Sequence, residues 1–262
     1  MATQLTDLGF GVRSVDILGV RVDDVTIDEA VAIAGAAIRS SQTHRIVTPN
    51  AEMTMTARHD ADFRRILNDS TLAIPDGAGL LLAARLLGAP LRVQVAGTDL
   101  AERVAELSAA NGYRLFLLGA APGIADLAAK RLVGLNPALQ IAGTYAGSAE
   151  PAADDVTRAR LLEAGRIDVL LVAFGARKQE AWIERNQARL GIPLAIGVGG
   201  VFDFWSGRVP RAPRLIRRVG FDWLFRLAVQ PWRWRRQLAL PWFLVAVTLA
   251  GVERRWRGTP ST

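Results

Sequence analysis

The stretch Val169-Leu-Leu-Val-Ala-Phe-Gly-Ala-Arg-Lys-Gln-Glu180 decides the fold class of this chain. Val169–Phe174 is an uninterrupted apolar run, which is typical of a strand buried on both faces of a sheet. Gly175 ends the run, and a helical pattern follows over Lys178–Leu190. A short buried strand, a glycine turn and a helix together indicate a βαβ unit, and such units build parallel sheets.

The same order of strand and helix recurs along the chain. Further strands are predicted at Arg45–Thr48, Thr71–Pro75, Tyr113–Leu118, Gln140–Thr144 and Leu194–Val198. Further helices are predicted at Ala30–Ile38 (after the capping box Thr26-Ile-Asp-Glu29), Thr54–Asn68, Ala78–Leu87, Thr98–Asn111, Ile124–Val133 and Asp154–Ala164. We therefore predict an α/β fold, with a Rossmann-like, mainly parallel sheet flanked by helices. Ligands of such sheets bind at the carboxyl ends of the strands.

The composition excludes several kinds of site. The 262 residues include no Cys and two His, so neither a disulfide nor a thiolate or multi-histidine metal site is expected. Asp60-Ala-Asp62 has the form of a metal-binding acidic pair. It falls inside the helical pattern Thr54–Asn68, so we interpret it as a solvated helix face. We expect no metal and no cofactor.

Charge divides the chain near Trp205–Pro213. The net charge is +7, and residues 206–262 hold twelve Arg, no Lys, two acidic residues and five of the seven Trp. Residues 1–205 are close to neutral. We predict a core at 1–205 and a helical, basic and aromatic appendage at 206–262. Arg binds lipid phosphates and Trp settles at the headgroup level, so the expected partner of the appendage is an anionic membrane surface.

The appendage is expected to lie on a membrane without crossing it. Its most apolar stretch, Leu238–Val252, is about fifteen residues long and contains Pro241, whereas a span needs about twenty. Apolar and polar residues are interspersed in Phe221–Leu227, which favours a membrane over nucleic acid. Met1–Val12 shows no signal peptide, so we expect a cytoplasmic protein, peripheral on the inner face of the cell membrane. A second copy is the alternative cover for Leu238–Val252, which would make a homo-oligomer.

Small and polar residues gather at the predicted carboxyl ends of the strands. The segments are Thr48-Pro-Asn-Ala-Glu52, Pro75-Asp-Gly-Ala-Gly79, Val95-Ala-Gly-Thr-Asp99, Leu118-Gly-Ala-Ala-Pro-Gly123, Phe174-Gly-Ala-Arg-Lys-Gln-Glu180 and Ile196-Gly-Val-Gly-Gly-Val-Phe-Asp203. Glycine turns that open helices can offer N–H groups to a phosphate, although turns alone also use glycine. Several such turns in one sheet predict a nucleotide pocket. Because the chain has neither GxGxxG nor a P-loop motif, a typical dinucleotide fold and a P-loop NTPase are not indicated.

Four side chains in these segments suit chemistry or binding. Asp76 is expected at the rim of the sheet, partly removed from water, where a carboxylate suits general base work or caps the helix that follows. Thr48 and Asn50 suit hydrogen bonds to a sugar or nucleobase, or a turn and a helix cap. Lys178 lies where a helix begins, a place that the helix dipole makes unfavourable for a cation. Either a phosphate partner or simple solvation accounts for it.

The succession of motifs from Val47 to Asp203 resembles the WecG/TagA/CpsF glycosyltransferases. The motifs are Val47-Thr-Pro-Asn-Ala-Glu-Met53, Ile74-Pro-Asp-Gly77, Val95-Ala-Gly-Thr-Asp99, Gly175-Ala-Arg-Lys-Gln-Glu180 and Gly197-Val-Gly-Gly-Val-Phe-Asp203. Gly207–Arg226 is similar to the closing signature of that family. The resemblance runs from about Ile17 to Arg236 and does not cover Leu238–Val252. It departs from the family at Pro49, where many members have Val.

The resemblance implies an inverting, metal-independent enzyme. It would move N-acetylmannosamine or a relative from a UDP-sugar to a polyprenyl-diphosphate-linked sugar, in teichoic acid or other cell-surface polysaccharide synthesis. Asp76 then matches the proposed base, and Thr48 the threonine near the reacting sugar. The candidate substrate-binding residues, from the turns and the resemblance, are Asn50, Gly77, Gly97, Thr98, Asp99, Gly119, Gly175, Lys178, Gln179, Glu180 and Gly199, with Arg208, Arg211, Arg214, Arg217 and Arg218 of the appendage expected to meet the diphosphates.

Two alternatives stay open at this point. The first is the same class of enzyme with UDP-glucose or UDP-N-acetylmannosaminuronic acid as the donor. The second is a non-enzymatic, nucleotide-binding membrane scaffold, which would share the pocket and the appendage but would need no base at Asp76.

Overall fold

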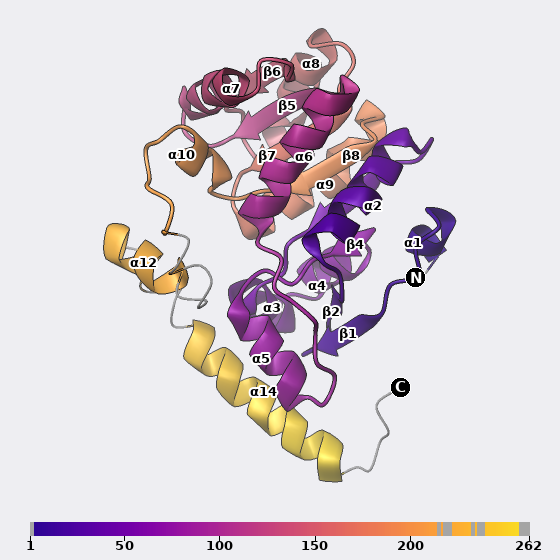
Figure 1. The fold of residues 1–262 in the computed structure, drawn as a ribbon, viewed down its shortest axis with the longest axis vertical. Coiled ribbons are helices and arrows are strands. Elements are labelled where there is room, and N and C mark those ends of the chain that lie inside the picture. Colours follow the sequence, from indigo (N-terminus) through magenta and orange to yellow (C-terminus); the bar gives the residue numbers. More distant parts are fainter. Residues whose placement is uncertain (1–2, 214–215, 217–221, 232–233, 235–238, 257–262) are drawn as a thin grey trace.

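The computed structural model describes residues 3–213, 216, 222–231, 234 and 239–256 (Figure 1). Six parallel strands form the central sheet in the order β4-β3-β8-β7-β5-β6. They are β3 (His44–Val47), β4 (Leu72–Ala73), β5 (Arg114–Gly119), β6 (Gln140–Tyr145), β7 (Val169–Ala173) and β8 (Leu194–Gly197). Every residue of β7 and β8 is buried, as their apolar sequences predict for central strands of a covered parallel sheet. The predicted α/β fold is confirmed.

Helices cover both faces of this sheet. One face packs against α2 (Ile27–Arg39), α6 (Gly97–Asn111), α7 (Ile124–Leu135) and α10 (Val201–Trp205). The other packs against α3 (Ala51–His59), α4 (Ala61–Asn68), α8 (Asp154–Glu163) and α9 (Ala176–Leu190), while a short 3-10 turn, η1 (Pro151–Ala153), precedes α8. The alternation of strand side chains divides the core: Leu115 and Leu117 belong to the first layer, and Phe116 and Leu118 to the second.

A hairpin near the amino terminus was not predicted. β1 (Ser14–Ile17) and β2 (Val20–Asp23) pair antiparallel after the short helix α1 (Thr3–Asp7). The hairpin is joined to the central sheet by Asp23, whose buried carboxylate accepts a hydrogen bond from the Ala73 N–H at 2.8 Å. Burial raises the pKa of Asp23, against the opposing effect of Arg21. The alternation of Val15, Ile17, Val20 and Val22 was the available signal for these strands.

The single helix predicted over Thr54–Asn68 is wrong. The chain forms α3 and α4, which are separated at Asp60. Asp60 has an extended backbone, and its side chain accepts the Phe63 N–H at 3.0 Å, so it caps α4. Its other oxygen pairs with Arg177 at 2.5 Å. A capping aspartate inside a helical pattern starts a new helix because its side chain satisfies a free N–H there.

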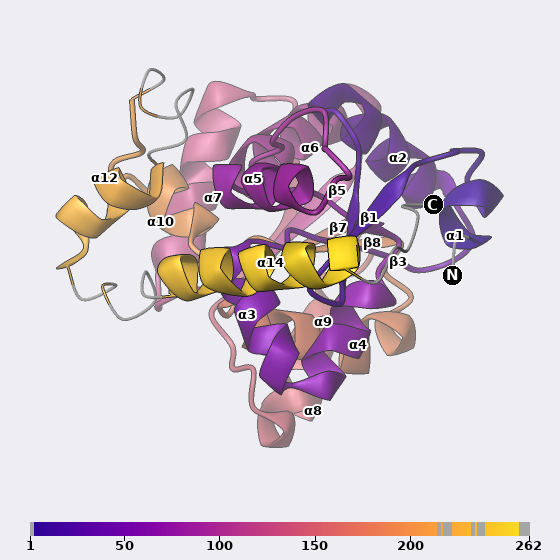
Figure 2. The ribbon, with the colours of Figure 1, turned by 90° about the horizontal axis from the view of Figure 1, so that it is seen from below.

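The carboxyl-terminal stretch folds back onto the core. Helix α14 (Ala239–Trp256) lies against α3 and α5 (Ala78–Leu86), between them when the molecule is seen from below (Figure 2). Phe243 and Val247 are fully buried in a cluster with Leu80 and Leu87. No helix in the described part of the chain is both long and apolar enough to span a membrane. The extension beyond Arg236 therefore contributes a helix to the hydrophobic core around α5.

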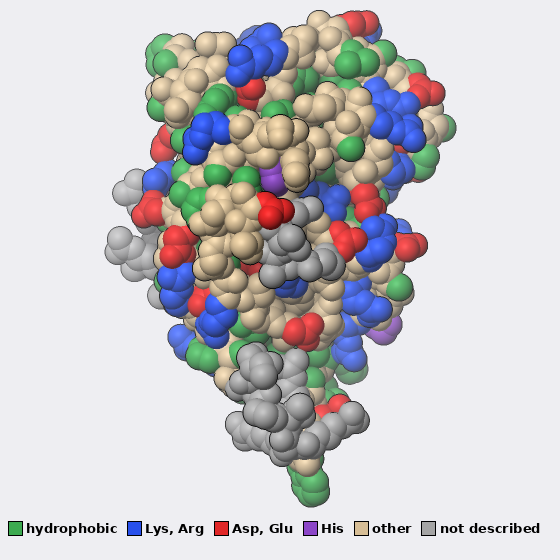
Figure 3. Space-filling model, turned by 90° about the vertical axis from the view of Figure 1, so that its right-hand side faces the viewer, with side chains coloured by type: hydrophobic (Ala, Val, Ile, Leu, Met, Phe, Trp, Pro, Cys, Tyr) green, Lys and Arg blue, Asp and Glu red, His purple; other side chains and the backbone are tan. Residues whose placement is uncertain are grey.

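The outward side of α14 is apolar as well. Trp242, Val245, Leu249, Val252 and Trp256 recur at intervals of three and four residues, and each is exposed, between 48% for Val252 and 87% for Trp256. At the lower end of the molecule, where α14 ends, hydrophobic side chains project beyond a body whose acidic and basic side chains are intermixed (Figure 3). We call these five side chains the outer stripe of α14.

We expect Phe243→Ala to lower the free energy of unfolding by about 3 kcal/mol or more, because it leaves a cavity between α14 and α5. Trp242→Ala, at the neighbouring exposed position, should change it by about 0.5 kcal/mol or less. Urea denaturation of both variants measures the two values. Equal effects would contradict the docked position of α14.

Candidate active site

Four loops leave neighbouring strands at the carboxyl edge of the sheet. The order β4-β3-β8-β7 sets side by side the loops that begin at Ile74, Thr48, Val198 and Phe174. The motifs quoted for these loops are far apart in sequence, yet the sheet places them along one edge. The two neighbours of β3 bring the Pro-Asp-Gly loop and the Gly199 turn to either side of Thr48.

Backbone hydrogen bonds hold Asp76 between two other loops. The Asp76 N–H donates to the Pro49 carbonyl at 3.0 Å, and the Pro75 carbonyl accepts the Val95 N–H at 2.9 Å. The Asp76 side chain is half-buried, as expected for the rim of the sheet. The N-cap position of α5 is occupied by Gly77 with φ +107°, one residue after Asp76. Glycine is the residue that adopts this backbone without strain.

Thr48 lies against the first residue of α6. A Cβ atom added to Gly97 would stand 3.1 Å from Thr48 Cγ2 and 3.4 Å from Thr48 Oγ1. The absence of a side chain at Gly97 therefore lets the amino end of α6, with Thr98 and Asp99, approach the loop after β3. Asn50, two residues on, caps α3: its side-chain oxygen accepts the Met53 N–H at 3.0 Å. Direct contact of Thr48 or Asn50 with a substrate stays a prediction.

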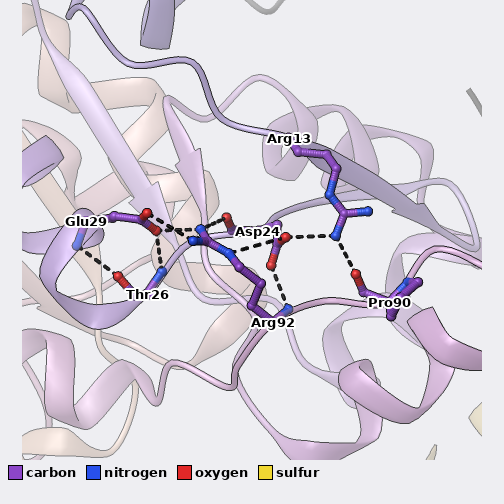
Figure 4. Close-up of polar contacts among 6 residues, drawn as sticks. All are labelled: Arg13, Asp24, Thr26, Glu29, Pro90 and Arg92. Atoms are coloured by element: carbon purple, nitrogen blue, oxygen red, sulfur yellow. Dashed lines mark hydrogen bonds and ion pairs between the residues drawn. The ribbon is translucent and has the colours of Figure 1, made fainter.

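A network of charges fixes the loop that delivers α6 (Figure 4). The Arg92 backbone N–H donates to Asp24 at 2.8 Å, and the Arg92 guanidinium donates to Glu29 at 2.6 Å. The Arg13 guanidinium donates to Asp24 at 2.7 Å. Arg13 also donates to the Pro90 carbonyl. Burial alone would raise the pKa of Asp24, but the Arg92 N–H and the Arg13 guanidinium lower it. This network was not predicted.

Gln179 and Glu180 lie under the turn after β8. Gln179 Oε1 accepts the Gly199 N–H at 3.0 Å, and Gln179 Nε2 donates to Glu180 Oε1 at 3.1 Å. Glu180 is fully buried, and this burial raises its pKa to about 7 against the lowering effects of Gln179 and Arg45. Both residues lie near the start of α9, whose N-cap is Gly175 with φ +92°.

Two other candidates make contacts away from these loops. Lys178 pairs with Glu150 at 3.0 Å, and both side chains are about two thirds exposed, so the pair contributes little to stability. Gly119, at the end of β5, packs on β7: a Cβ there would stand 2.7 Å from the Ala173 carbonyl carbon. Close strand packing thus explains Gly119 by itself. Phosphate contacts of either residue stay predictions.

The appendage reaches the site through two arginines. Arg211 bonds both oxygens of Glu102, at 2.7 and 2.8 Å, and pairs with Asp99 as well, so it anchors the start of the appendage to the first turns of α6. Arg226, on α12 (Asp222–Val229), stacks over Phe204 at 4.9 Å. Its guanidinium occupies the space that a Cβ of Gly200 would need. Sequence reasoning missed Arg226.

The remaining arginine candidates are less defined. Arg208 is exposed just after α10. Arg214, Arg217 and Arg218 lie outside the described residues. Within the described residues, no group of three or more His, Asp or Glu side chains is arranged to hold a metal ion. The clustered candidates are thus Thr48, Asp76, Gly97 and the Gly199 turn with Gln179.

Comparison with known protein families identifies the family of this chain. The model of the glycosyl transferase WecG/TagA/CpsF family matches residues 15–257. The chain belongs to this family. It is therefore a glycosyltransferase, and the match includes α14, which the quoted motifs did not reach.

Three similar proteins share one enzyme name. A protein of Bacillus spizizenii is 32% identical over 202 residues, covering 77% of each chain, and one of Staphylococcus aureus strain MRSA252 is 27% identical over 238 residues, covering 90% of this chain and 92% of its own. Each is called N-acetylglucosaminyldiphosphoundecaprenol N-acetyl-beta-D-mannosaminyltransferase. A Bacillus subtilis relative of that name is 31% identical over 202 residues.

We expect Gly97→Ala to reduce the rate of glycosyl transfer by about tenfold or more, because the new methyl group displaces Thr48 and small misplacements in an active site are costly. Gly134→Ala is the control, since a Cβ at that helical glycine meets nothing within 4 Å. Initial rates and melting temperatures of both variants test this. A fully active Gly97→Ala would show that the Thr48 contact is not needed.

Proposed function

We propose that this chain transfers N-acetylmannosamine or a closely related sugar from a UDP-sugar to N-acetylglucosaminyl-diphospho-polyprenol, with inversion and without a metal. The observation that carries the proposal is the half-buried Asp76, held by its backbone beside Thr48 and the amino end of α6 in a chain of this family. The names of the relatives support the transferred sugar and the acceptor.

The proposed reaction is a single displacement. The acceptor hydroxyl oxygen attacks the anomeric carbon as Asp76 takes its proton, and the bond from that carbon to the UDP oxygen breaks. UDP leaves with the electron pair. Attack from the face opposite UDP inverts the anomeric configuration. Thr48, next to Asp76 at the edge of the sheet, is proposed to orient the reacting sugar.

The negative charge that develops on UDP needs a positive partner. Helices α5, α6 and α9 all begin at this edge, and a helix amino terminus presents N–H groups and a partial positive charge. Arg226, at the Gly200 turn, and the other arginines of the appendage add full charges. We propose that these groups take the part that a metal plays in many sugar-nucleotide transferases.

We further propose that the outer stripe of α14 rests on the anionic inner face of the cell membrane. Tryptophan lies at both ends of the stripe, and the segment 206–262 carries twelve arginines and two acidic residues. The opposite side of α14 lies close to the site loops: a Cβ on Gly79 would stand 3.3 Å from Leu240 and 3.8 Å from Ala51. A bilayer under α14 would therefore bring a lipid-linked acceptor near Asp76.

We expect Asp76→Asn to lower kcat by about 10²-fold or more, the scale of a lost general base. The assay is UDP release from UDP-N-acetylmannosamine with a short-chain acceptor, in EDTA. Asp62→Asn, on the exposed side of α4, is the control. Turnover that EDTA abolishes would contradict metal independence, and an unchanged kcat in Asp76→Asn would show that Asp76 is not the base. UDP-glucose and UDP-N-acetylmannosaminuronic acid, tested in parallel, separate the donors.

We expect the double change Leu249→Gln and Val252→Gln to weaken binding to phosphatidylglycerol vesicles by about tenfold or more, since each removes apolar surface from the contact. Leu162→Gln, 65% exposed on α8, is the matched control. Vesicle co-sedimentation measures binding, with RNA as the competing ligand. Unchanged vesicle binding, together with the loss of a dimer in sedimentation velocity, would instead assign the stripe to a second copy.

A further inference from the structure

Gln179 and Glu180 occupy space that exists because residue 197 is glycine. The side chains are 2% and 0% exposed, and they pass beneath the end of β8. A Cβ atom on Gly197 would overlap with Glu180 Oε1 and with Gln179 Nε2. The end of β8 is therefore built around these two polar side chains.

The Gln179 amide connects Glu180 to the turn above it. The Gly199 N–H can only donate, so the amide oxygen of Gln179 must face it, at 3.0 Å. The amide nitrogen then faces Glu180 Oε1, at 3.1 Å. Glu180 thus supplies the acceptor that keeps the amide from rotating. Gly199 has φ +55° and adjoins Gly200, on which Arg226 lies, so the chain of contacts runs from Glu180 to the appendage.

Few charged groups act on Glu180. Arg45, on β3, is the charged group that acts on it, and Arg45 donates to the Ile66 carbonyl at 2.9 Å. Glu184, Asp69 and Arg65 also act electrostatically on Arg45. Within the described part of the chain, Glu180 Oε2 has no hydrogen-bond partner. Glu180 is fully buried, and its contacts are with Gln179 and with the end of β8 at Gly197.

We propose that Glu180 is a positioning residue: it orients the Gln179 amide and, through it, holds the Gly199 turn beside Thr48 and Arg226. This refines the expectation that Glu180 binds substrate. This inference rests on the proposed function only in the experiment that measures turnover. A carboxylate accepts a hydrogen bond more strongly than a neutral carboxyl or amide does, so the hold on Gln179 strengthens when Glu180 loses its proton.

Burial raises the pKa of Glu180 to about 7, so the group titrates in an accessible range. Because the folded pKa lies above the ordinary value of 4.5, protonated Glu180 favours the folded state, and this contribution is lost as pH rises from about 4.5 to 7. Glu180→Gln removes the titration while keeping the size and an acceptor oxygen. This variant should therefore fold, and it should be more stable than the natural chain above pH 7.

The experiment compares the natural chain, Glu180→Gln and Glu184→Gln. Glu184, one turn further along α9, is half-buried, pairs with the exposed Arg65 and serves as the control. The first readout is the Gly199 amide resonance in nuclear magnetic resonance spectra between pH 5.5 and 8.5. We expect it to shift with a midpoint near 7 in the natural chain and in Glu184→Gln, and to stay constant in Glu180→Gln.

The second readout is the pH profile of UDP release. We expect kcat of the natural chain to fall by up to about tenfold from pH 8 to pH 6, the change in carboxylate fraction for a pKa near 7. This step should be absent in Glu180→Gln, with KM unchanged. A constant Gly199 resonance in the natural chain, or identical profiles in all three proteins, overturns the inference. If the Gly199 resonance shifts with pH but the protein shows no turnover, the proposed substrates are rejected and the positioning of the turn is still supported.

Discussion

The hydrogen bond from the Asp76 N–H to the Pro49 carbonyl is the contact on which the site depends. It extends the pairing of β3 and β4 beyond the sheet, and the bond from Val95 to Pro75 attaches the approach to α6 in the same way. These contacts join backbone atoms, so the positions of the Asp76 and Thr48 backbones do not depend on the contacts of their side chains. The charge network around Asp24 then holds the loop before α6, which brings Gly97 against Thr48.

Buried carboxyl groups hold two further parts of the structure near the carboxyl edge of the sheet. Asp23 joins the hairpin to β4, and Glu180 supports the Gly199 turn through Gln179. Each carboxyl is buried at a cost in solvation, which raises its pKa. Each carboxylate also accepts a hydrogen bond from the group that it holds, the Ala73 N–H for Asp23 and the Gln179 amide for Glu180, so removing one partner would leave the other buried and unsatisfied. Their presence at the ends of β2, β4 and β8 is explained by the loop geometry that they hold.

The appendage is joined to the core at separate places with different chemistry. Arg211 attaches its start to α6 by ion pairs, Arg226 attaches α12 to the Gly200 turn, and α14 packs its apolar inner side on α3 and α5. One helix thus has an apolar side that completes the core and an apolar stripe that faces outward. The inner side of α14 lies beside Gly79, three residues after Asp76, so this helix and the Asp76 loop are close together.

The sequence by itself determined the parallel sheet, the motifs at its carboxyl edge and the change of character after Trp205, because these follow from local apolar runs, glycine turns and charge. It also pointed to the family through the order of its motifs. The division of Thr54–Asn68 at Asp60, the hairpin at Ser14–Asp23, the docking of Phe243 and the place of Arg226 were decided only by the tertiary structure. The docking of Phe243, the place of Arg226 and the attachment of the hairpin through Asp23 to Ala73 depend on partners far away in the chain, whereas the division at Asp60 depends on a capping contact that competes with helix periodicity. Glu180 shows the same limit: its motif marked it as important, but only the tertiary structure shows that it is buried beneath Gly197 and bonded to Gln179.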